Sequence, residues 1–139
     1  MVDASVWVSS FLPRDVNHGP SRRWIEHALA NNMVVSPGLL LAEVTGALSR
    51  RTGQTGLSNR ASELLQRHPN SRLTIIEVAL AVFAAEIAAD LRLRGADALY
   101  VALAARLDVP LVTWDNEQRE RGSSQIATLT PAELLEAIR

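Results

Sequence analysis

The sequence predicts a single α/β domain in which helices cover both faces of a parallel sheet. Short runs rich in β-branched residues alternate with longer segments of helical apolar spacing, an order typical of parallel sheets. The chain has 139 residues, of which 47% are hydrophobic, so its length fits one domain and its composition supplies a core. We find no repeat or linker and therefore treat residues 1–139 as one domain.

The expected elements follow one another along the whole chain. The expected strands span residues 1–6, 33–35, 73–76, 111–114 and 126–129. The expected helices begin after Pro20 and then span residues 39–51, 59–67, 78–93 and 98–107, with a last helix after Thr130. Thr130, Pro131 and Glu133 form the pattern of an N-cap, a first-turn proline and an acidic first turn. Residues 53–58 are expected to form a flexible surface loop.

The composition excludes several classes of protein. No cysteine is present, which excludes thiolate metal sites and disulfides. All 14 basic residues are arginine, so phosphate-loop NTPases and Schiff-base enzymes, which need a lysine, are excluded. A net charge of −1 argues against a general electrostatic grip on nucleic acid. No apolar run reaches the ~18 residues of a membrane span, and no secretory signal is visible, so we expect a cytoplasmic protein.

Two acidic residues lie in apolar surroundings. Asp3 lies in the apolar first strand, and Glu43 shares the apolar stripe of its helix with Leu40 and Ala47. A buried carboxylate must be paired or bound to a metal, because burying it alone costs several kcal/mol on an order-of-magnitude scale. Taken singly, Asp3 could be a turn residue or a cap, and Glu43 could form a buried salt bridge with an arginine.

Two further acids have good structural explanations of their own. Asp97 precedes a helix, where aspartate is a favoured N-cap. Asp115 and Asn116 follow a strand, and such a pair is common in turns. However, active sites in open parallel sheets lie beyond the carboxyl ends of the strands, which is where Asp3 and Asp115 are expected.

The motifs around these acids occur in a recognisable order. They are Val2-Asp3-Ala4-Ser5, Leu41-Ala42-Glu43-Val44, Gly95-Ala96-Asp97-Ala98-Leu99-Tyr100 and Leu111-Val112-Thr113-Trp114-Asp115-Asn116. With them the chain resembles the PIN-domain ribonucleases over essentially its whole length. The closest likeness is to the VapC-type toxins of bacterial and archaeal toxin–antitoxin pairs. The resemblance implies a three-layer α/β/α fold with a parallel five-stranded sheet.

The resemblance also implies a metal site and an activity. Carried over to this chain, the family's four carboxylates are Asp3, Glu43, Asp97 and Asp115. They would bind Mg²⁺ or Mn²⁺, which would activate a water for the hydrolysis of RNA. We expect Asp3 and Asp97 to bind the ion directly. We expect Glu43 and Asp115 to bind it directly or through metal-bound water.

Other residues are candidates for supporting roles. Ser5 and Thr113 match family positions for supporting hydroxyls, and Asn116 could orient a water or a carboxylate. Alternatively, Ser5 and Thr113 could be ordinary hydroxyls at strand ends, and Asn116 an ordinary amide in a turn. The arginines that could bind RNA phosphates are Arg14, Arg22, Arg23, Arg50 and Arg51. A solvated face is the other reading of these charges.

Partners follow from the same resemblance. We expect RNA as the substrate, and structured RNA such as a tRNA or ribosomal RNA loop, because a net charge near zero gives little grip on arbitrary phosphate backbones. A small antitoxin protein is expected to occlude the acidic pocket, since carboxylates attract an arginine as readily as Mg²⁺. A homodimer is also expected from the family.

Two alternatives belong to other classes. A haloacid-dehalogenase-type phosphatase also begins with a strand that ends in aspartate, but it needs a second aspartate where this chain has Ser5, and it needs a lysine. A catalytically degenerate PIN fold that serves as an RNA-binding or scaffold module remains open. Metal-dependent cleavage that EDTA abolishes would separate the enzyme from this module.

Overall fold

Helices dominate the structure, and its strands are short. The computed structural model describes residues 1–138. The helices are α1 (Ala4–Phe11), α2 (His18–Asn31), α3 (Leu40–Thr52), α4 (Thr55–Arg67), α5 (Val78–Leu91), α6 (Gly95–Leu107), α7 (Asn116–Gly122) and α8 (Pro131–Ala137). The strands are β1 (Val34–Pro37), β2 (Ser71–Thr74), β3 (Leu111–Val112) and β4 (Thr128–Leu129). The α/β class predicted from the sequence is confirmed, with more helix and less strand than expected.

The strands form two parallel pairs that the N-terminal segment joins. β1 pairs with β2, and β3 pairs with β4. Residues 1–3 lie between the pairs, where Val2 N–H donates to Val35 O at 3.1 Å and Asp3 N–H donates to Val112 O at 3.0 Å. The pairing of Val2 with Val112 is an isolated bridge. The prediction of one five-stranded sheet is therefore wrong for the described residues, because the first segment is too short to form a strand of its own.

The predicted first strand is also wrong beyond residue 3, because α1 begins at Ala4. Asp3 is the N-cap of this helix, and its Oδ2 accepts a hydrogen bond from Ser5 N–H at 3.0 Å. An aspartate cap stabilises a helix start by about 1 kcal/mol. The helix then buries both Val6 and Trp7, so its apolar, β-branched composition resembled that of a strand. The cap thus turns the chain sharply just past the paired segment.

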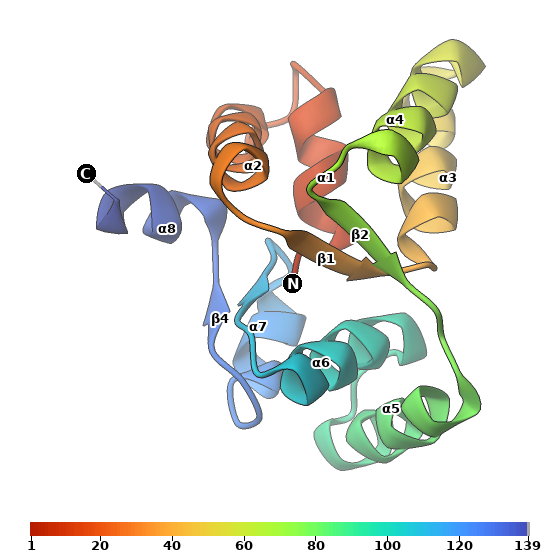
Figure 1. Cartoon of the computed structure of the whole chain (residues 1–139), viewed down its shortest axis with the longest axis vertical. Helices are drawn as coiled ribbons and strands as arrows, with labels where there is room; N and C mark the ends of the chain where they lie inside the picture. Colours follow the sequence, from red (N-terminus) through yellow and green to blue (C-terminus); the bar gives the residue numbers. More distant parts are fainter. Residues whose placement is uncertain (139) are drawn as a thin grey trace.

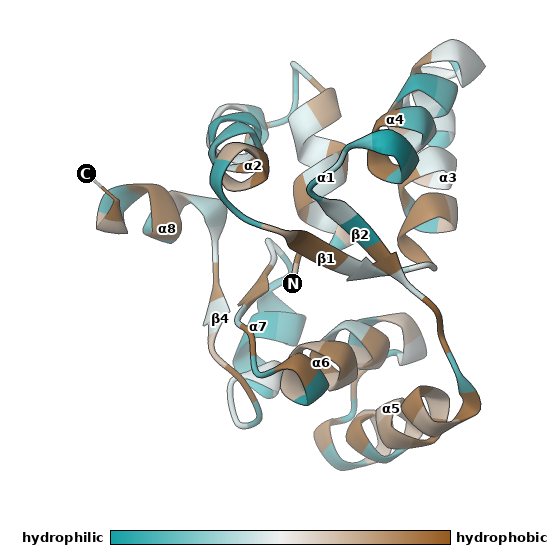
Figure 2. Cartoon of the chain, in the orientation of Figure 1, coloured by the Kyte–Doolittle hydropathy of each residue, from teal (hydrophilic) through white to brown (hydrophobic). Residues whose placement is uncertain are grey.

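Helices lie on both sides of β1 and β2. In Figure 1, α1, α2, α3 and α4 lie on one side of these strands, and α5 and α6 lie on the other. α6 contacts β1, and α5 packs on α6 as an outer helix. Figure 2 shows that hydrophobic residues dominate β1, α5 and α6, whereas hydrophilic residues are frequent on α2 and α4. None of the helices within residues 1–138 is long and apolar enough to cross a membrane.

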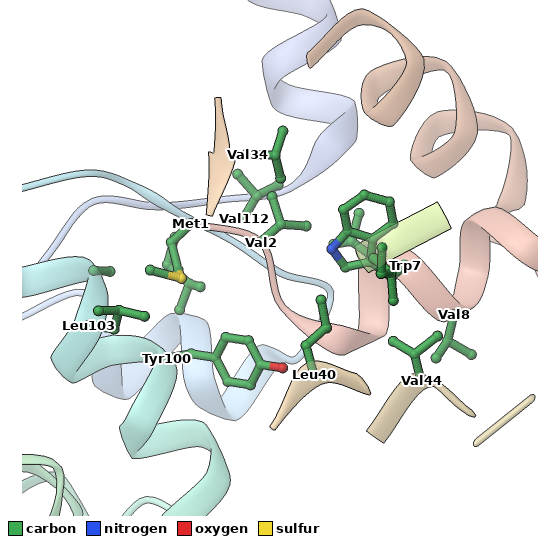
Figure 3. Close-up of a cluster of buried hydrophobic side chains, with 14 of the residues drawn as sticks. Met1, Val2, Trp7, Val8, Val34, Leu40, Val44, Tyr100, Leu103 and Val112 are labelled. Atoms are coloured by element: carbon green, nitrogen blue, oxygen red, sulfur yellow. The ribbon is translucent and has the colours of Figure 1, made fainter. Parts of the chain in front are cut away.

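The core gathers around the N-terminal segment. Trp7 is 1% exposed and Tyr100 is 0% exposed, and both are among the largest fully buried side chains. Figure 3 shows these side chains among residues of the N-terminal segment, α1, β1, α3, α6 and β3, namely Met1, Val2, Val8, Val34, Leu40, Val44, Leu103 and Val112. Side chains from segments far apart in the sequence therefore fix the position of residues 1–3, the last of which is Asp3.

Several predicted boundaries shift. Gly53 ends α3 in the left-handed conformation, with φ of 67°, and α4 begins at Thr55. The loop predicted for residues 53–58 is therefore wrong beyond residue 54, because a glycine C-cap allows the chain to reverse within two residues. The strands predicted over 73–76, 111–114 and 126–129 are shorter or displaced, as β2, β3 and β4 show. The helix α7 was not predicted.

The strongest local signals are confirmed. α5 begins at Val78, where the sequence placed it. Thr130 and Glu133 form a reciprocal capping box at the start of α8, and Pro131 is the first helical residue. Hydrogen bonds between residues three apart determine this helix start, so no distant partner is needed to predict it.

Candidate functional site

Asp3 lies at the carboxyl end of the N-terminal segment, beside the end of β3. It is 6% exposed, and its Oδ2 accepts hydrogen bonds from Ser5 N–H at 3.0 Å and from the Thr113 hydroxyl at 3.1 Å. Ser5 Oγ lies 3.3 Å from Thr113 Oγ1 and accepts a bond from Trp114 N–H at 3.1 Å. The hydroxyls of Ser5 and Thr113 therefore join the start of α1 to the segment that follows β3.

Asp115 follows on the same segment and caps α7. Its backbone N–H donates to Thr113 Oγ1 at 3.0 Å, and its Oδ1 accepts from Gln118 N–H at 2.8 Å. The Gln118 side chain is 0% exposed and donates from Nε2 to the backbone carbonyl of Asp97 at 3.3 Å. Gln118 thereby ties α7 to the start of α6. The turn expected at Asp115 is therefore a helix N-cap.

Asp97 lies inside the first turn of α6 rather than at its N-cap. The helix begins at Gly95, and Arg94 occupies the N-cap position without a side-chain capping bond. The N-cap explanation for Asp97 is therefore wrong, since no capping hydrogen bond uses its carboxylate. Its side chain is 15% exposed. The helix N-terminus favours this acidic side chain through its partial positive charge.

Arg94 bridges two of the candidate acids. Its Nε donates to Asp97 Oδ2 at 2.9 Å, and its Nη2 donates to Asp115 Oδ2 at 3.0 Å. Hydrogen bonding and charge attraction from Asp97, and attraction from Asp115, raise the pKa of Arg94. No role was predicted for Arg94 from the sequence. Its position three residues before Asp97 was the available signal, because side chains with that spacing share a helix face.

Glu43 lies in the first turn of α3 and pairs with a tyrosine. The Tyr100 hydroxyl donates to Glu43 Oε2 at 2.6 Å. Figure 3 shows the Tyr100 ring reaching from α6 toward α3, where its hydroxyl lies near Leu40. The alternative of a buried salt bridge between Glu43 and an arginine is therefore wrong. The sequence motif around Asp97 contains Tyr100 but predicts no role for it, because only the tertiary structure brings α6 against α3 at this point.

The charges of these acids act on one another. Burial raises the pKa of Glu43, which the charges of Asp3 and Asp97 raise further, against the opposing effects of Tyr100 and Arg94. Burial also raises the pKa of Asp97, which the charges of Asp115 and Asp3 raise further, against the attraction of Arg94. The acids Asp3, Glu43, Asp97 and Asp115 thus lie within electrostatic range, and we refer to them as the acidic cluster.

The donor set fits a hard divalent cation. The cluster offers only carboxylate oxygens, the ligands that Mg²⁺ and Mn²⁺ prefer. Its mutual repulsion is what a bound cation would relieve. Within residues 1–138, however, no three histidine or acidic side chains form a ready-made group for a metal ion. In this arrangement the Asp97 and Asp115 carboxylates are instead engaged by Arg94.

Several of the candidate arginines lie away from the cluster. α1 and α3 run side by side in the same direction, since Asp3 acts on Glu43 at their starts and Arg51 binds Asp15 at 2.9 Å at their ends. Arg14, Arg50 and Arg51 therefore lie roughly 12 Å along these helices from the acids, at 1.5 Å per residue. The other two candidates are exposed on α2, where Arg22 binds Glu26 at 2.8 Å.

Asn116 is not brought into the cluster either. It is an exposed residue at the first position of α7. No hydrogen bond from its side chain is formed among the described residues. The residues that do contact the acidic cluster are Ser5, Arg94, Tyr100, Thr113 and Gln118.

Asp3 and Asp115 lie at the carboxyl ends of parallel β segments, the edge at which open α/β sheets bind their ligands. The PIN domain family matches residues 1–123, which include the whole acidic cluster, and the chain belongs to this family. The PIN domain is a nuclease-type domain that generally depends on Mg²⁺. The comparison with curated proteins found no match for the chain.

Proposed function

We propose that the chain is a Mg²⁺- or Mn²⁺-dependent endoribonuclease whose metal-binding residues are the acidic cluster. The observation that carries the proposal is that acids from separate segments lie close together: Arg94 bridges Asp97 and Asp115, and the Thr113 hydroxyl contacts both Asp3 and the Asp115 backbone. The charges of Asp3 and Asp97 also raise the pKa of Glu43, whose pKa burial raises first. Burial and mutual repulsion make this arrangement unfavourable for folding alone. A structural role would not require like charges to face one another.

The residues of the cluster have distinct roles in this proposal. Asp3 and Asp97 hold the ion directly, and Glu43 and Asp115 hold it directly or through water. When bound, such an ion lowers the pKa of a water and stabilises charge on the phosphodiester. The Ser5 backbone and the Thr113 hydroxyl fix the Asp3 carboxylate, while Tyr100 fixes that of Glu43. Supporting hydrogen bonds of this kind orient metal ligands and tune their basicity.

We further propose a cellular role as the toxin of a toxin–antitoxin pair, acting in the cytoplasm on a tRNA or ribosomal RNA loop. The supporting argument is the motif order shared with the VapC-type toxins. A small antitoxin protein would place a basic side chain at the acidic cluster. Arg94 shows that a guanidinium can bind these carboxylates. The net charge of −1 supports recognition by local contacts and RNA shape rather than by general attraction.

A homodimer is part of the same proposal. Ile75, Val78 and Val82, on α5 and just before it, are 84%, 80% and 54% exposed. Exposed apolar groups that lie together commonly mark protein–protein contacts. The opposite side of α5 packs on α6, so these residues lie on the outer side of the helix. We propose that a second copy of the chain binds there.

The decisive test replaces single ligands. We expect Asp3→Asn and Asp97→Asn each to lower the rate of RNA cleavage by more than about 100-fold, beyond the effect found for outer-shell partners of metal ligands. Both variants should stay folded, because asparagine keeps the size of the side chain and removes a charge from a repelling set. Asp90→Asn, at an exposed residue of α5, is the matched control.

Purified protein is incubated with structured RNA in the presence of Mn²⁺, and in a parallel reaction with EDTA. Wild-type cleavage that EDTA abolishes supports the proposal. Normal cleavage by either variant would overturn the site assignment. If the protein binds RNA but does not cleave it with either Mg²⁺ or Mn²⁺, the RNA-binding or scaffold module would be favoured instead. Mapping new 5′ ends in cellular RNA would identify the substrate, and a broad scatter across messenger RNA would contradict a single structured target.

A further inference from the structure

Arg94 is positioned unlike any other cation of the described chain. One guanidinium binds Asp97 at 2.9 Å and Asp115 at 3.0 Å, through different nitrogens. The two acids come from different elements, the first turn of α6 and the N-cap of α7. The Arg94 side chain is 71% exposed, whereas those of Asp97 and Asp115 are 15% and 27% exposed. The cation thus covers the acids from the solvent side.

Helix formation does not explain this arginine. Arg94 is the N-cap residue of α6 and makes no capping hydrogen bond with its side chain. A positive side chain is unfavourable at a helix N-terminus, because the helix dipole is positive there. Serine, threonine, aspartate or asparagine would be preferred at that position. The contacts that favour an arginine here are therefore those with the acidic cluster.

We propose that Arg94 is a built-in counter-cation of the acidic cluster, which releases Asp97 and Asp115 when a divalent ion binds. This inference rests on the proposed function, since it requires the cluster to be a metal site. The Oδ2 atoms of Asp97 and Asp115 accept hydrogen bonds from Arg94. A divalent ion that uses these oxygens must therefore compete with the guanidinium.

The exchange needs no movement of the core. Arg94 precedes α6 and is largely exposed, so its side chain can rotate into solvent while α6 and α7 stay in place. Ion pairs of this exposure are weak because water screens them. A divalent ion, with twice the charge and no side-chain freedom to lose, can displace such a pair. The structure thus shows a cluster whose repulsion is partly relieved before any ion arrives.

Removing the competitor should strengthen ion binding. If the bridged state is populated about ten to one, it weakens the apparent affinity about tenfold. We therefore expect Arg94→Gln to bind Mn²⁺ about tenfold more tightly than the wild type. Arg94→Lys should lie between the two, because lysine keeps the charge but cannot reach both carboxylates with a planar fork. The matched control is Arg92→Gln, which removes the same charge from an exposed residue two positions earlier.

The experiment is a calorimetric titration of the full chain with Mn²⁺, after removal of metal with EDTA. Circular dichroism verifies that each variant is folded. Tighter binding by Arg94→Gln, with Arg92→Gln equal to the wild type, supports the inference. Equal or weaker binding by Arg94→Gln overturns it while leaving the proposed metal site intact. Absence of Mn²⁺ binding by every variant overturns both the inference and the proposed function.

A second measurement follows the ion-binding response of the wild-type chain and needs the Arg94→Lys variant only for assignment. The Nε–H signal of Arg94 can be followed by ¹⁵N-resolved NMR and assigned by its loss in Arg94→Lys. The signal should move toward that of a free arginine as Mg²⁺ is added, because the bond from Nε to Asp97 is broken. A signal that stays unchanged while Mg²⁺ binds would overturn the exchange even if the glutamine variant failed to fold.

Discussion

Tyr100 and Glu43 lie 57 residues apart, and their side chains meet through a 2.6 Å hydrogen bond. The tyrosine is fully buried, and its burial, together with the charges of Asp3 and Glu43, raises the pKa of its hydroxyl. The hydroxyl therefore stays protonated and can only donate to this carboxylate. The pair fixes α6 against α3 at the acidic cluster.

Loss of the tyrosine hydroxyl should therefore cost stability. We expect Tyr100→Phe to lower the free energy of unfolding by about 1–3 kcal/mol, because a partly buried carboxylate loses its charge-assisted donor. Urea denaturation measures the change. In a Glu43→Gln background the same substitution should cost less, and a double-mutant cycle isolates that coupling. Equal costs in both backgrounds would show that the bond to Glu43 contributes nothing.

The Thr113 hydroxyl should matter for cleavage more than for folding. Thr113→Val removes the donor to Asp3 Oδ2 and the acceptor of Asp115 N–H. We expect RNA cleavage to fall about 10–100-fold, the effect typical of outer-shell partners of metal ligands. Thr52→Val is the matched control, since the Thr52 hydroxyl likewise donates to one group, Leu48 O, and accepts from another, Gln54 N–H. Equal rates for the two variants would contradict the role of Thr113.

The stability of the metal-free protein should depend on pH through the acidic cluster. The pKa of Glu43 is raised above its ordinary value of 4.5, and that of Asp97 above 3.8, first by burial and then by neighbouring acids. An acid whose pKa is higher in the folded state stabilises the fold while protonated, and this contribution is lost as pH rises through the raised pKa.

We therefore compare the wild type in EDTA with a variant that carries both Glu43→Gln and Asp97→Asn. Relative to this variant, the free energy of unfolding of the wild type should fall as pH rises above these ordinary values. Urea denaturation across the acidic to neutral range provides the measurement, and titrating groups away from the acidic cluster cancel in the difference. A difference that is flat, or that grows with pH, would contradict the repulsion inferred for the cluster.

The outer side of α5 should control self-association. We expect a variant with Val78→Asp and Val82→Glu to be monomeric and still folded, because both side chains are exposed in the isolated chain. Light scattering coupled to gel filtration measures the mass. Val16→Asp, at a loop residue that is 92% exposed, is the control and should leave the mass unchanged. A wild-type chain that is monomeric at high concentration would contradict the proposed homodimer.

The sequence by itself determined those features that depend on neighbouring residues. The capping box of Thr130 and Glu133 forms through bonds three residues apart, and the helix from Val78 follows from its alanine-rich, largely apolar composition. The α/β class follows from the alternation of segments. The four candidate acids were also identified from the sequence, through the short motifs around them and through the apolar surroundings of Asp3 and Glu43.

Only the tertiary structure decided where these groups meet. The sequence identified Asp3 as a candidate, but the residues after it are apolar enough to form either a strand or a helix. In the structure residues 4–11 form a helix that Asp3 caps and that buries Trp7 in the core. The bond from Tyr100 to Glu43 and the bridge from Arg94 to Asp115 join different elements, so no local pattern encodes them. Local hydrogen bonding and apolar spacing act over a few residues, whereas the geometry of this acidic cluster depends on how distant helices pack.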